Sequence, residues 1–508
     1  MFKKILVANR GEIARRIILA CREFGVRSVA VFSEADRDTP WVRMADESYP
    51  LVGVSTSQTY LNQEAILRIA AIAGVDALHP GYGFLSENAE FAAACAGAGI
   101  TFIGPSPEAM RLMGSKAEAR VLAEAAGVPV VPGVDGAGKR DDELREAALA
   151  IGFPILIKAS AGGGGKGMRV VHSEEELDDA LTAARSEARS AFGDDHVIVE
   201  RYFTQIHHVE IQLLGDHHGN MIHLFERECS IQRRHQKIVE ESPAPSLGII
   251  PGGAALRQQM AAAAISLAQA AQYVNAGTVE FIVDISNPNH GRFYFLEMNT
   301  RLQVEHPVTE LVAGLDLVAW QIRIAAGEPL PFAQDEIRQR GHAIECRIYA
   351  EDPANQFFPS TGRITHYRPP QGPGVRVDDG IETEMVITPH YDPMLAKLIT
   401  WGNDRPDAIR KMIRALRDTV ILGVTTNIPY LLTILRQPAF VAGETSTNYL
   451  LEQMDGWSNR REVSESDLLA VAVLELLNEE QRHGSGESSQ SAAQPDPWDD
   501  PSNWRNVG

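Results

Sequence analysis

Two lysines bracket a run of glycines near residue 160. Lys158 lies at the end of a predicted strand in FPILIKAS, and the residues that follow include Gly163, Gly164, Gly165, Lys166, Gly167 and Met168. Glycines let backbone N–H groups approach phosphate oxygens without a Cβ in the way, and lysines add positive charge. A Walker loop would be G-x-x-x-x-G-K-[ST] before a helix, which differs from this pattern. The run therefore predicts a strand-loop-strand flap over a nucleotide. The alternative, a flexible hairpin tip, does not explain the bracketing lysines.

A carboxylate pair follows on two apolar stretches joined by the turn-rich segment ISNPNHG. Glu280 lies in TVEFIVD, while Glu297 and Asn299 lie two residues apart in RFYFLEMN. We expect a hairpin that brings Glu280 beside Glu297, with Glu297 and Asn299 on the same face as Phe293 and Phe295. Oxygen ligands of this kind suit Mg²⁺ or Mn²⁺ that bridges phosphates. The alternative, an exposed pair of carboxylates, fits poorly with the flanking apolar residues.

Two further clusters contain residue types suited to anion binding and proton transfer. Arg301, Gln303, Val304 and Glu305 follow directly; an arginine can grip a planar oxyanion and a glutamate can take its proton. For Arg301 alone, a structural salt bridge is an equal alternative. The segment RECSIQRRHQKIVEESPAP is the second cluster, in which His235 is interpreted as a polar ligand contact rather than part of a solvated patch. His207 and His208 are ambiguous by themselves.

The elements that must position these residues alternate between strand and helix at the start of the chain. KKILVA, VRSVAVFS, VDALHPG and ITFIGP predict short strands, and Ile13, Ile17, Cys21 and Phe24 recur at helical spacing. This pattern predicts an α/β unit with Rossmann-like topology. No G-x-G-x-x-G follows the first strand, so a dinucleotide site is not supported.

Breaks in composition predict four regions. Residues 1–114 form the α/β domain, 115–203 a small lid domain with a helical linker, and 204–454 a larger mixed α+β part rich in alternating strands. Residues 455–508 turn to Glu, Ser, Gln and Asp, and predict one amphipathic helix in SESDLLAVAVLELLNEEQ followed by an acidic, flexible tail.

Composition excludes several classes of protein. The chain has 508 residues, a hydrophobic fraction of 44% and a net charge of −20. The acidic balance argues against nucleic acid as a partner, and no apolar run is long enough to span a bilayer. The first apolar run breaks at Asn9-Arg10-Gly11, too early for a signal peptide, so we expect a cytoplasmic protein. Cys21, Cys95, Cys229 and Cys346 are scattered without a C-x-x-C pair, which predicts reduced, buried thiols.

The residues in these clusters resemble a known family, the biotin carboxylases, up to about Met454. Nine blocks carry the resemblance in the family's order: KILVANRGEIARRI, HPGYGFLSEN, FIGPSPEAMRLMGSK, IKASAGGGGKGMRVV, HVEIQ, CSIQRRHQKIVEESPAP, FLEMNTRLQVEHPVTE, HAIECRIYAEDP and HYDPMLAKL. The resemblance implies an ATP-grasp fold with an N-terminal Rossmann-like domain, a glycine-flap lid and a C-terminal mixed α+β domain. It also implies ATP- and bicarbonate-dependent carboxylation of biotin, in the first half-reaction of an acyl-CoA carboxylase, acetyl-CoA being one candidate.

The resemblance transfers roles to individual residues. ATP-binding positions would be Lys116, Lys158, Gly163, Gly164, Gly165, Lys166, Gly167, Met168, Glu200, Phe203, His208, Gln232, His235, Glu280 and Glu297. The metal ligands would be Glu280, Glu297 and Asn299, which hold two Mg²⁺ or Mn²⁺ ions. Bicarbonate would be held by Lys237, Arg301, Gln303 and Val304, with Glu305 as the general base. Biotin would contact Tyr82 and Arg347, and the catalytic set would be Glu305, Arg347, Lys237 and Arg301.

The implied mechanism proceeds through carboxyphosphate. Glu305 deprotonates bicarbonate, which attacks the γ-phosphate of ATP; the product decomposes to CO₂ and phosphate. Phosphate then takes the N1 proton of biotin, while Arg347 stabilises the ureido oxyanion.

Some positions depart from the family pattern. Asn448 stands where bacterial members often have a histidine near the nucleotide, and Leu19 and Pro373 replace an arginine and a phenylalanine of a dimer interface that keeps Arg16, Glu23 and Arg376. A homodimer is still expected. No A-M-K-M or V-M-K-M sequence is present, so biotin would arrive on a separate biotin carboxyl carrier protein, with carboxyltransferase subunits as further partners. The segment PDPWDDPSNWRN resembles the segment that follows this domain in fused acyl-CoA carboxylase α-chains, and this resemblance implies an acidic tail that docks partner subunits.

Two rival functions share part of the pattern. Another ATP-grasp ligase, such as one half of a carbamoyl-phosphate synthetase, would have the flap and the carboxylate pair but not HPGYGFLSE together with EMNTRLQVEHPVTE. A catalytically silent ATP-binding scaffold would not require Lys237, Glu305 and Arg347.

Overall fold

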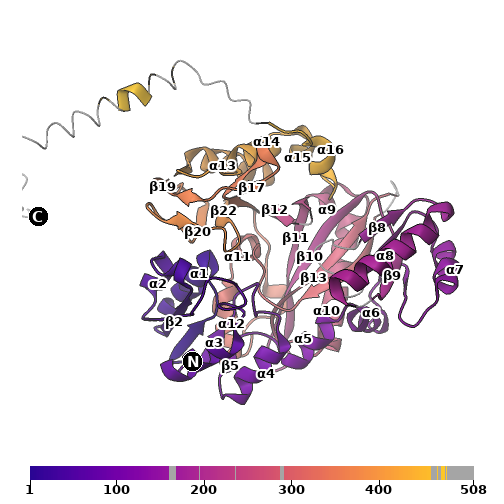
Figure 1. Ribbon diagram of the computed structural model, residues 1–508, viewed down its shortest axis with the longest axis horizontal. Coiled ribbons are helices and arrows are strands. Elements are labelled where there is room, and N and C mark those ends of the chain that lie inside the picture. Colours follow the sequence, from indigo (N-terminus) through magenta and orange to yellow (C-terminus); the bar gives the residue numbers. More distant parts are fainter. Residues whose placement is uncertain are drawn as a thin grey trace, which may run out of the picture. The chain divides into compact units, whose positions relative to one another are not determined.

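The computed structural model describes residues 1–159, 168–193, 195–234, 236–286, 291–458, 466, 469, 471–474 and 476. Contacts divide the chain into two units, Met1–Trp457 and Ser458–Gly508. Three larger sheets organise the first unit, with five, four and eight strands (Figure 1). In the second unit, residues 466, 469, 471–474 and 476 are helical, as the periodicity of this segment predicts. The rest of the predicted tail lies outside the described residues.

A parallel sheet forms the start of the chain, in the strand order β3-β2-β1-β4-β5. Its strands are rich in Val, Ile and Leu because both faces are covered. Helix α1 turns Ile13, Ile17 and Cys21 inward against one face, which confirms the predicted apolar stripe. The elements are β1 (Lys4–Val7), α1 (Gly11–Glu23), β2 (Arg27–Phe32), α2 (Pro40–Met44), β3 (Glu47–Pro50), α3 (Gln63–Ala73), β4 (Ala77–His79), α4 (Ala89–Gly97), β5 (Thr101–Phe102) and α5 (Pro107–Gly114).

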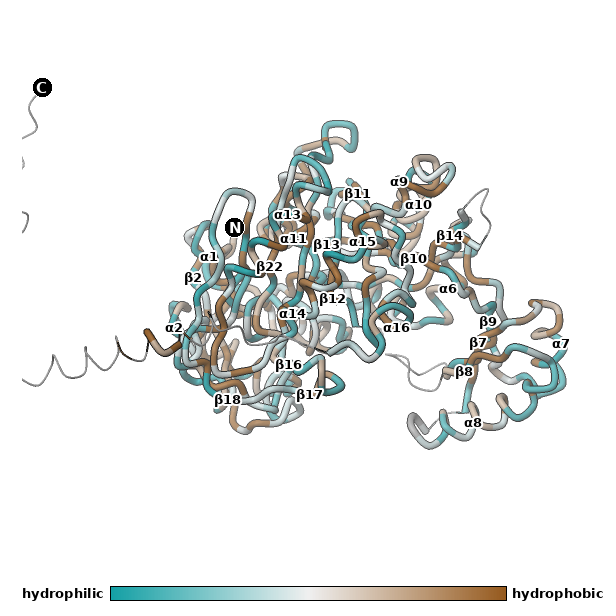
Figure 2. Tube along the Cα trace, turned by 90° about the horizontal axis from the view of Figure 1, so that it is seen from above, coloured by the Kyte–Doolittle hydropathy of each residue, from teal (hydrophilic) through white to brown (hydrophobic). Residues whose placement is uncertain are grey.

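A small antiparallel sheet follows, in the order β6-β9-β7-β8. Leu144 of α7 and Leu177 and Leu181 of α8 pack against Ile155 and Ile157 of β7, so both helices cover one face. In Figure 2 strands β7 and β9 are largely hydrophobic, whereas much of α8 is hydrophilic. The elements are α6 (Lys116–Ala125), β6 (Gly133–Asp135), α7 (Asp141–Ile151), β7 (Ile155–Ala159), β8 (Met168–Val171), α8 (Leu177–Phe192) and β9 (Val197–Arg201).

The eight-stranded antiparallel sheet spans the rest of the first unit, in the order β14-β13-β10-β11-β12-β15-β22-β20. It joins strands from the middle of the chain with strands from its last third. The strands are β10 (Ile206–Gly215), β11 (Met221–Arg233), β12 (Gln236–Ser242), β13 (Asn275–Asp284), β14 (Arg292–Asn299), β15 (His342–Tyr349), β20 (Val375–Asp379) and β22 (Met394–Gly402).

Two apolar clusters cover one face of this sheet. The first includes Met260 and Leu267 of α10 (Gly253–Ala270) against Val209 and Phe281. The second gathers residues of α13 (Arg405–Asp418), α14 (Ile428–Ile434), α15 (Pro438–Ala442) and α16 (Tyr449–Gln453). The remaining helices are α9 (Ser246–Ile249), α11 (His306–Ala313) and α12 (Leu317–Ala325). Short strands form three two-stranded sheets: β16 (Glu351–Asp352) with β17 (Phe358–Pro359), β18 (Gly362–Arg363) with β21 (Val386–Ile387), and β19 (His366–Arg368) with β23 (Val420–Leu422).

The cysteines behave as the sequence predicts. Cys21, Cys95, Cys229 and Cys346 are all buried free thiols. Among the helices of the described residues, none is both long and apolar enough to cross a membrane.

Candidate active site

One face of the eight-stranded sheet carries a row of charged side chains across four strands. Arg227 on β11 lies opposite Glu210 on β10, Glu210 lies opposite Glu280 on β13, and Glu280 lies opposite Glu297 on β14. Directly opposed residues in a sheet point to the same face, and neighbours along a strand point to the other. The alternate residues of β10, Val209, Ile211 and Leu213, therefore lie in the apolar core behind the row.

The predicted hairpin between Glu280 and Glu297 is confirmed, but one detail of it was wrong. The register shifts between Glu280 and Phe281, so Glu280 faces Glu297 while Phe281 faces Phe295. This bulge turns Glu297 and Asn299 away from Phe293 and Phe295, which belong to the apolar core on the opposite face. Alternation counted along β14 alone predicted a shared face because an extra residue in a strand leaves no clear mark in the sequence.

Lys237 on β12 lies at the centre of the site and contacts three carboxylates. Its Nζ donates to Glu210 at 2.7 Å, to Glu280 at 2.8 Å and to Glu305 at 2.7 Å. All three carboxylates are buried. Burial alone would lower the pKa of Lys237, but these three carboxylates raise it well above its ordinary value. The ammonium is therefore permanently charged and holds together anions that would otherwise repel one another.

Glu305 and Arg347 extend this network along the sheet. Glu305 occupies the N-cap position of α11 and accepts from Arg347 Nη2 at 3.0 Å, while Arg347 Nε donates to Glu240 at 2.6 Å. Burial opposes ionisation of Glu305, yet Lys237 and Arg347 lower its pKa to about 2. Glu305 is thus ionised and forms ion pairs with two cations, Lys237 and Arg347.

Arg301 and Gln303 contact residues of the network around Lys237, and Val304 contacts Lys397. Arg301 donates to Asn299 Oδ1 at 2.8 Å and also forms an ion pair with Glu87 at 3.0 Å. Gln303 donates to Glu280 at 2.9 Å. The carbonyl of Val304 accepts from Lys397 at 2.8 Å. Hydrogen bonds therefore connect Arg301, through Asn299, and Gln303 to Glu280, which contacts Lys237. Arg301 also makes the salt bridge that the sequence left open.

The predicted nucleotide residues that the structure describes lie on α6, on the small sheet or just after its last strand, and on the large sheet. Lys158 pairs with Glu200 at 2.6 Å, and Phe203 stacks on Tyr294 with ring centroids 5.0 Å apart. Burial is the main cause that lowers the pKa of Lys116, and Glu297 partly offsets it. Met168 begins β8 and is exposed. Gly163, Gly164, Gly165, Lys166, Gly167 and His235 lie outside the described residues.

The remaining predicted positions are joined to the site to different degrees. His208 Nε2 lies 3.1 Å from Glu280, and Gln232 lies opposite Lys237 in the sheet. The hydroxyl of Tyr82 contacts Glu12, which pairs with Lys397 at 3.2 Å. Tyr82 therefore reaches the site through Lys397 and not by a direct contact with Arg347. Asn448 donates to the carbonyl of Thr204 at 3.2 Å.

Several residues of the site escaped the sequence analysis. Arg227 is fully buried and contacts Glu210, Gln212, Thr278, Gln303 and Thr309. Alternation along HVEIQLLG would have placed Glu210 and Gln212 beside His208, because residues two apart share a face. Glu240, Glu345 and Lys397 come together only through pairing of β12, β15 and β22, for which the sequence carries no local signal.

The row of carboxylates has the composition of a site for divalent cations. Glu280, Glu297 and Asn299 present oxygen atoms on one face, and Asn299 Nδ2 donates to Glu280 at 2.8 Å. Burial, and then the charge of Glu280, raises the pKa of Glu297, so an added cation would relieve this repulsion. The residues present therefore fit Mg²⁺ or Mn²⁺. In the described part of the chain, His208 and Glu210 also bring ligand atoms within 4.8 Å of Glu280.

Comparison with known proteins agrees with this arrangement along nearly the whole first unit. Profiles described as "Biotin carboxylase, N-terminal domain", "Carbamoyl-phosphate synthase L chain, ATP binding domain" and "Biotin carboxylase C-terminal domain" match residues 1–110, 115–333 and 345–452. Biotin carboxylase from Nostoc sp. is 50% identical over 451 residues, 89% of this chain and 99% of the relative. The chain belongs to the biotin carboxylase family.

Other members of the biotin carboxylase family have different final substrates. A pyruvate carboxylase subunit from Methanothermobacter thermautotrophicus is 51% identical over 456 residues, 90% of this chain and 91% of the relative. The crystal structure of the biotin carboxylase domain dimer of Hydrogenobacter thermophilus 2-oxoglutarate carboxylase, with MgADP, ADP and bicarbonate, has a TM-score of 0.84 and 47% identity, and covers 91% of this chain and 100% of that chain. The fold is therefore the ATP-grasp fold of biotin carboxylases, and the chain is an ATP-dependent ligase of this type.

Proposed function

We propose that this chain uses ATP and bicarbonate to carboxylate biotin that is attached to a separate carrier protein. The observation that carries the proposal is the joined set Lys237, Glu305 and Arg347. It places a fixed cation, a carboxylate and a guanidinium beside a row of carboxylates suited to metal ions. A carbamoyl-phosphate synthetase half is disfavoured because the profiles on both sides of the ATP-binding segment are those of biotin carboxylases.

The nucleotide would bind between the lid and the large sheet. Lys116 and Lys158 would contact ATP phosphates, and the glycine run between residues 163 and 167 would cover them. Glu200 and Phe203 would border the adenine, with His208, Gln232 and His235 along the nucleotide. Glu280, Glu297 and Asn299 would hold Mg²⁺, two ions in our proposal, which neutralise phosphoryl charge.

Bicarbonate would enter beside Lys237, Arg301, Gln303 and the backbone of Val304. An anion that binds to Lys237 competes with Glu305 for the ammonium, which loosens the contact that keeps the pKa of Glu305 low. Glu305 can then take the bicarbonate proton as the anion attacks the γ-phosphate of ATP. The products are ADP and carboxyphosphate, and a closed lid keeps water from the latter.

Carboxylation of biotin completes the proposed sequence. Carboxyphosphate splits into CO₂ and phosphate, phosphate takes the N1 proton of biotin, and N1 then bonds to CO₂. Arg347 would stabilise the negative charge on the ureido oxygen. Its Nε donates to Glu240 at 2.6 Å and its Nη2 donates to Glu305 at 3.0 Å, and these two contacts fix the orientation of the guanidinium. Tyr82 would border the biotin ring.

The partners are part of the proposal. We expect a carrier protein and carboxyltransferase subunits, and a homodimer like that of the 2-oxoglutarate carboxylase domain. Of the interface positions predicted, Arg16 and Arg376 both contact Glu310 within this chain, at 3.2 and 2.6 Å. The related pyruvate and 2-oxoglutarate carboxylases leave the final acceptor open, so a role in fatty acid synthesis and a cytoplasmic location remain predictions.

The tail has a separate test. If residues beyond Trp457 dock partner subunits, a chain that ends there should keep turnover with free biotin but lose assembly with the partners in size-exclusion chromatography. Unchanged assembly would contradict that role.

The direct test of the function is incorporation of labelled bicarbonate into biotin. We expect acid-labile label on free biotin or on the carrier only when ATP and Mg²⁺ are both present. Replacement of bicarbonate by carbamate should give no ATP turnover. Labelled carbamoyl phosphate in place of labelled biotin would contradict the proposal.

A further inference from the structure

Lys397 on β22 is a fully buried lysine beside the catalytic centre, and the reaction proposed above assigns it no role. Strand β22 pairs with β15 so that Lys397 lies opposite Arg347. It also pairs with β20 so that Lys397 lies opposite Asp378. Directly opposed residues in a sheet point to the same face. Lys397 therefore points to the same side as the guanidinium that we propose contacts biotin.

The ammonium of Lys397 contacts the backbone on one side and a carboxylate on the other. Its Nζ donates to the carbonyl of Val304 at 2.8 Å and lies 3.2 Å from Glu12 Oε1. Asp378 lies further away, at 3.7 Å. Burial alone would lower the pKa of Lys397, but nearby carboxylates, above all Glu12, raise it above its ordinary value. The lysine is therefore charged, and its hydrogen bond to Val304 is charge-assisted.

The contact with Val304 bears on the general base. Val304 directly precedes Glu305, and one planar peptide unit joins its carbonyl to the N–H of Glu305. A fixed carbonyl therefore fixes the orientation of this peptide at the N-cap of α11. Lys237 and Arg347 hold the carboxylate of Glu305 at the other end of the residue. Lys397 thus completes the contacts that hold Glu305, and it also holds the backbone that we propose borders bicarbonate.

The contact with Glu12 leads to the tyrosine that we propose borders biotin. Glu12 lies in the first turn of α1, and its Oε1 accepts from the hydroxyl of Tyr82 as well as facing Lys397. Glu12 is buried, and its Oε2 makes no hydrogen bond within the described part of the chain, so Oε1 carries both contacts. The ammonium of Lys397 also lies 5.9 Å from the centre of the Tyr82 ring. Loss of the ammonium would therefore disturb the acceptor of the Tyr82 hydroxyl.

We propose that Lys397 is a positioning residue for both substrates: it holds the Val304 carbonyl on the bicarbonate side and, through Glu12, the Tyr82 hydroxyl on the biotin side. This inference rests on the function proposed above. Lys397 acts through these residues and not on the reacting atoms. One lysine from the last third of the chain thereby sets the start of α1 and the segment before α11 relative to each other.

Lys397→Met tests this role because methionine keeps much of the apolar stem and removes the ammonium. Steady-state turnover of the full chain is measured with ATP, Mg²⁺, bicarbonate and free biotin. We expect the KM for bicarbonate and the KM for biotin each to rise about tenfold or more, since loss of a charge-assisted hydrogen bond corresponds to roughly such a factor. The Kd of MgATP should stay unchanged in equilibrium binding. The contacts of Lys397 among the described residues include none that we propose holds the nucleotide.

A second variant separates positioning from folding. Lys397→Met leaves the buried carboxylate of Glu12 without its cation, which destabilises the fold. Lys397→Met/Glu12→Gln removes both charges, and glutamine keeps an oxygen for the Tyr82 hydroxyl. The urea midpoint of the double variant should therefore recover toward that of the wild type, while both KM values stay raised. A purely structural role predicts instead that the KM values recover together with the midpoint.

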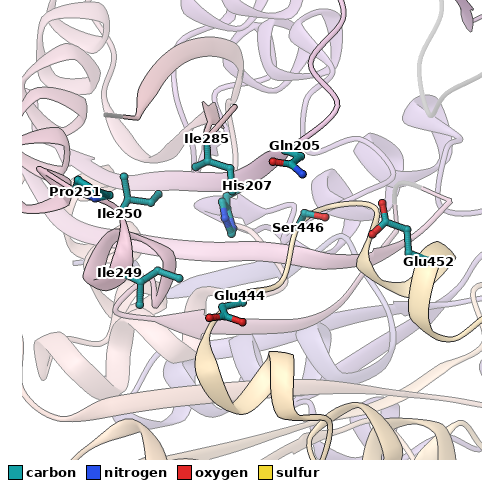
Figure 3. A pocket seen from close by; sticks show the side chains of 9 residues that line it. All are labelled: Gln205, His207, Ile249, Ile250, Pro251, Ile285, Glu444, Ser446 and Glu452. Carbon is teal, nitrogen blue, oxygen red and sulfur yellow. The ribbon is translucent and has the colours of Figure 1, made fainter. Parts of the chain in front are cut away.

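Two substitutions control for the loss of a lysine and for the loss of a carboxylate. Lys411 on α13 also donates to a backbone carbonyl, that of Trp401, at 3.0 Å, and pairs with Asp407 at 3.0 Å. Glu444 lies at a cavity whose described lining includes no residue of the catalytic centre (Figure 3). Lys411→Met and Glu444→Gln should leave both KM values unchanged.

Three results would overturn the inference: wild-type KM values in Lys397→Met; a rise in only one of the two KM values; or recovery of both KM values in the double variant. The wild-type chain in the same assay keeps the two proposals apart. Absence of bicarbonate-dependent turnover in the wild type would refute the proposed function and, with it, this inference. An active wild type with any of the three results would refute the positioning role alone.

Discussion

Replacement of Lys237 by methionine tests the electrostatic design of the active site. In the wild type one ammonium contacts Glu210, Glu280 and Glu305 at 2.7, 2.8 and 2.7 Å, and the lysine side chain is 14% exposed. Methionine keeps much of the apolar stem but removes the charge. Three buried carboxylates then lose their shared cation.

The burial of these groups determines how much free energy of unfolding Lys237→Met should lose. Removal of one partner from a buried ion pair costs about 3–5 kcal/mol because the other charge stays buried without compensation. Arg227 still contacts Glu210, and Arg347 still contacts Glu305, so the expected loss for Lys237→Met stays within this range at pH 8. Catalysis should be lost as well, because the variant lacks the ammonium that we propose contacts bicarbonate beside Glu305.

The loss of folding stability in Lys237→Met should increase as pH rises. Without Lys237 the pKa values of the nearby carboxyls rise above those in the unfolded chain, so the folded variant binds more protons than the unfolded one. Stability that depends on such groups is present at low pH and is lost as pH rises. The difference in stability between wild type and variant should therefore be larger at pH 8 than at pH 5.

Urea titrations followed by fluorescence measure these differences. Addition of Glu305→Gln to Lys237→Met removes one of the three carboxylates that the ammonium had paired, and should restore about 1 kcal/mol or more. The control is Lys411→Met, which removes a surface ion pair with Asp407 and should cost less than about 1 kcal/mol. If Lys237→Met were as stable as Lys411→Met at pH 8, this would refute the claim that Lys237 stabilises the three buried carboxylates.

Three further predictions concern single residues of the same network. Glu305→Gln should lower biotin carboxylation at least about 100-fold, the usual contribution of a general base, while ATP affinity stays unchanged in equilibrium binding; near-normal turnover would exclude Glu305 as the base. Arg347→Ala should reduce biotin carboxylation more than bicarbonate-dependent ATP hydrolysis, measured in parallel on one preparation, and equal losses would count against a contact with biotin. Burial, opposed by Lys397 but reinforced by Glu240, raises the pKa of Glu345 well above its ordinary value, so the stability of the protein should fall as pH rises above about 4.5. Glu345→Gln should remove this fall, and urea midpoints that change in parallel from pH 5 to pH 8 in both proteins would contradict the prediction.

Local patterns in the sequence predicted those parts of the site that local chemistry determines. Lys158 and the glycines, the hairpin between Glu280 and Glu297, and the helix that carries Ile13 and Ile17 all follow from periodicity or turn composition. The bulge that turns Glu297 away from Phe295 was not predictable, because it depends on how β14 pairs with β13.

Long-range pairing also decides which charges meet. Arg227, Glu240 and Lys397 are ordinary strand residues in the sequence, and their role appears only when distant strands join one sheet. The resemblance to the family named Lys237, Glu305 and Arg347, but it did not reveal that one ammonium contacts three carboxylates. That arrangement depends on side-chain geometry.

The central claim is that bicarbonate is activated beside Lys237 and Glu305 by attack on the γ-phosphate. Transfer of oxygen tests it most directly. With ¹⁸O-labelled bicarbonate, ATP, Mg²⁺ and biotin, we predict one ¹⁸O atom in each phosphate released, because the oxygen that attacks phosphorus stays on it when carboxyphosphate splits. Phosphate with only the ¹⁸O that solvent exchange supplies would contradict the account.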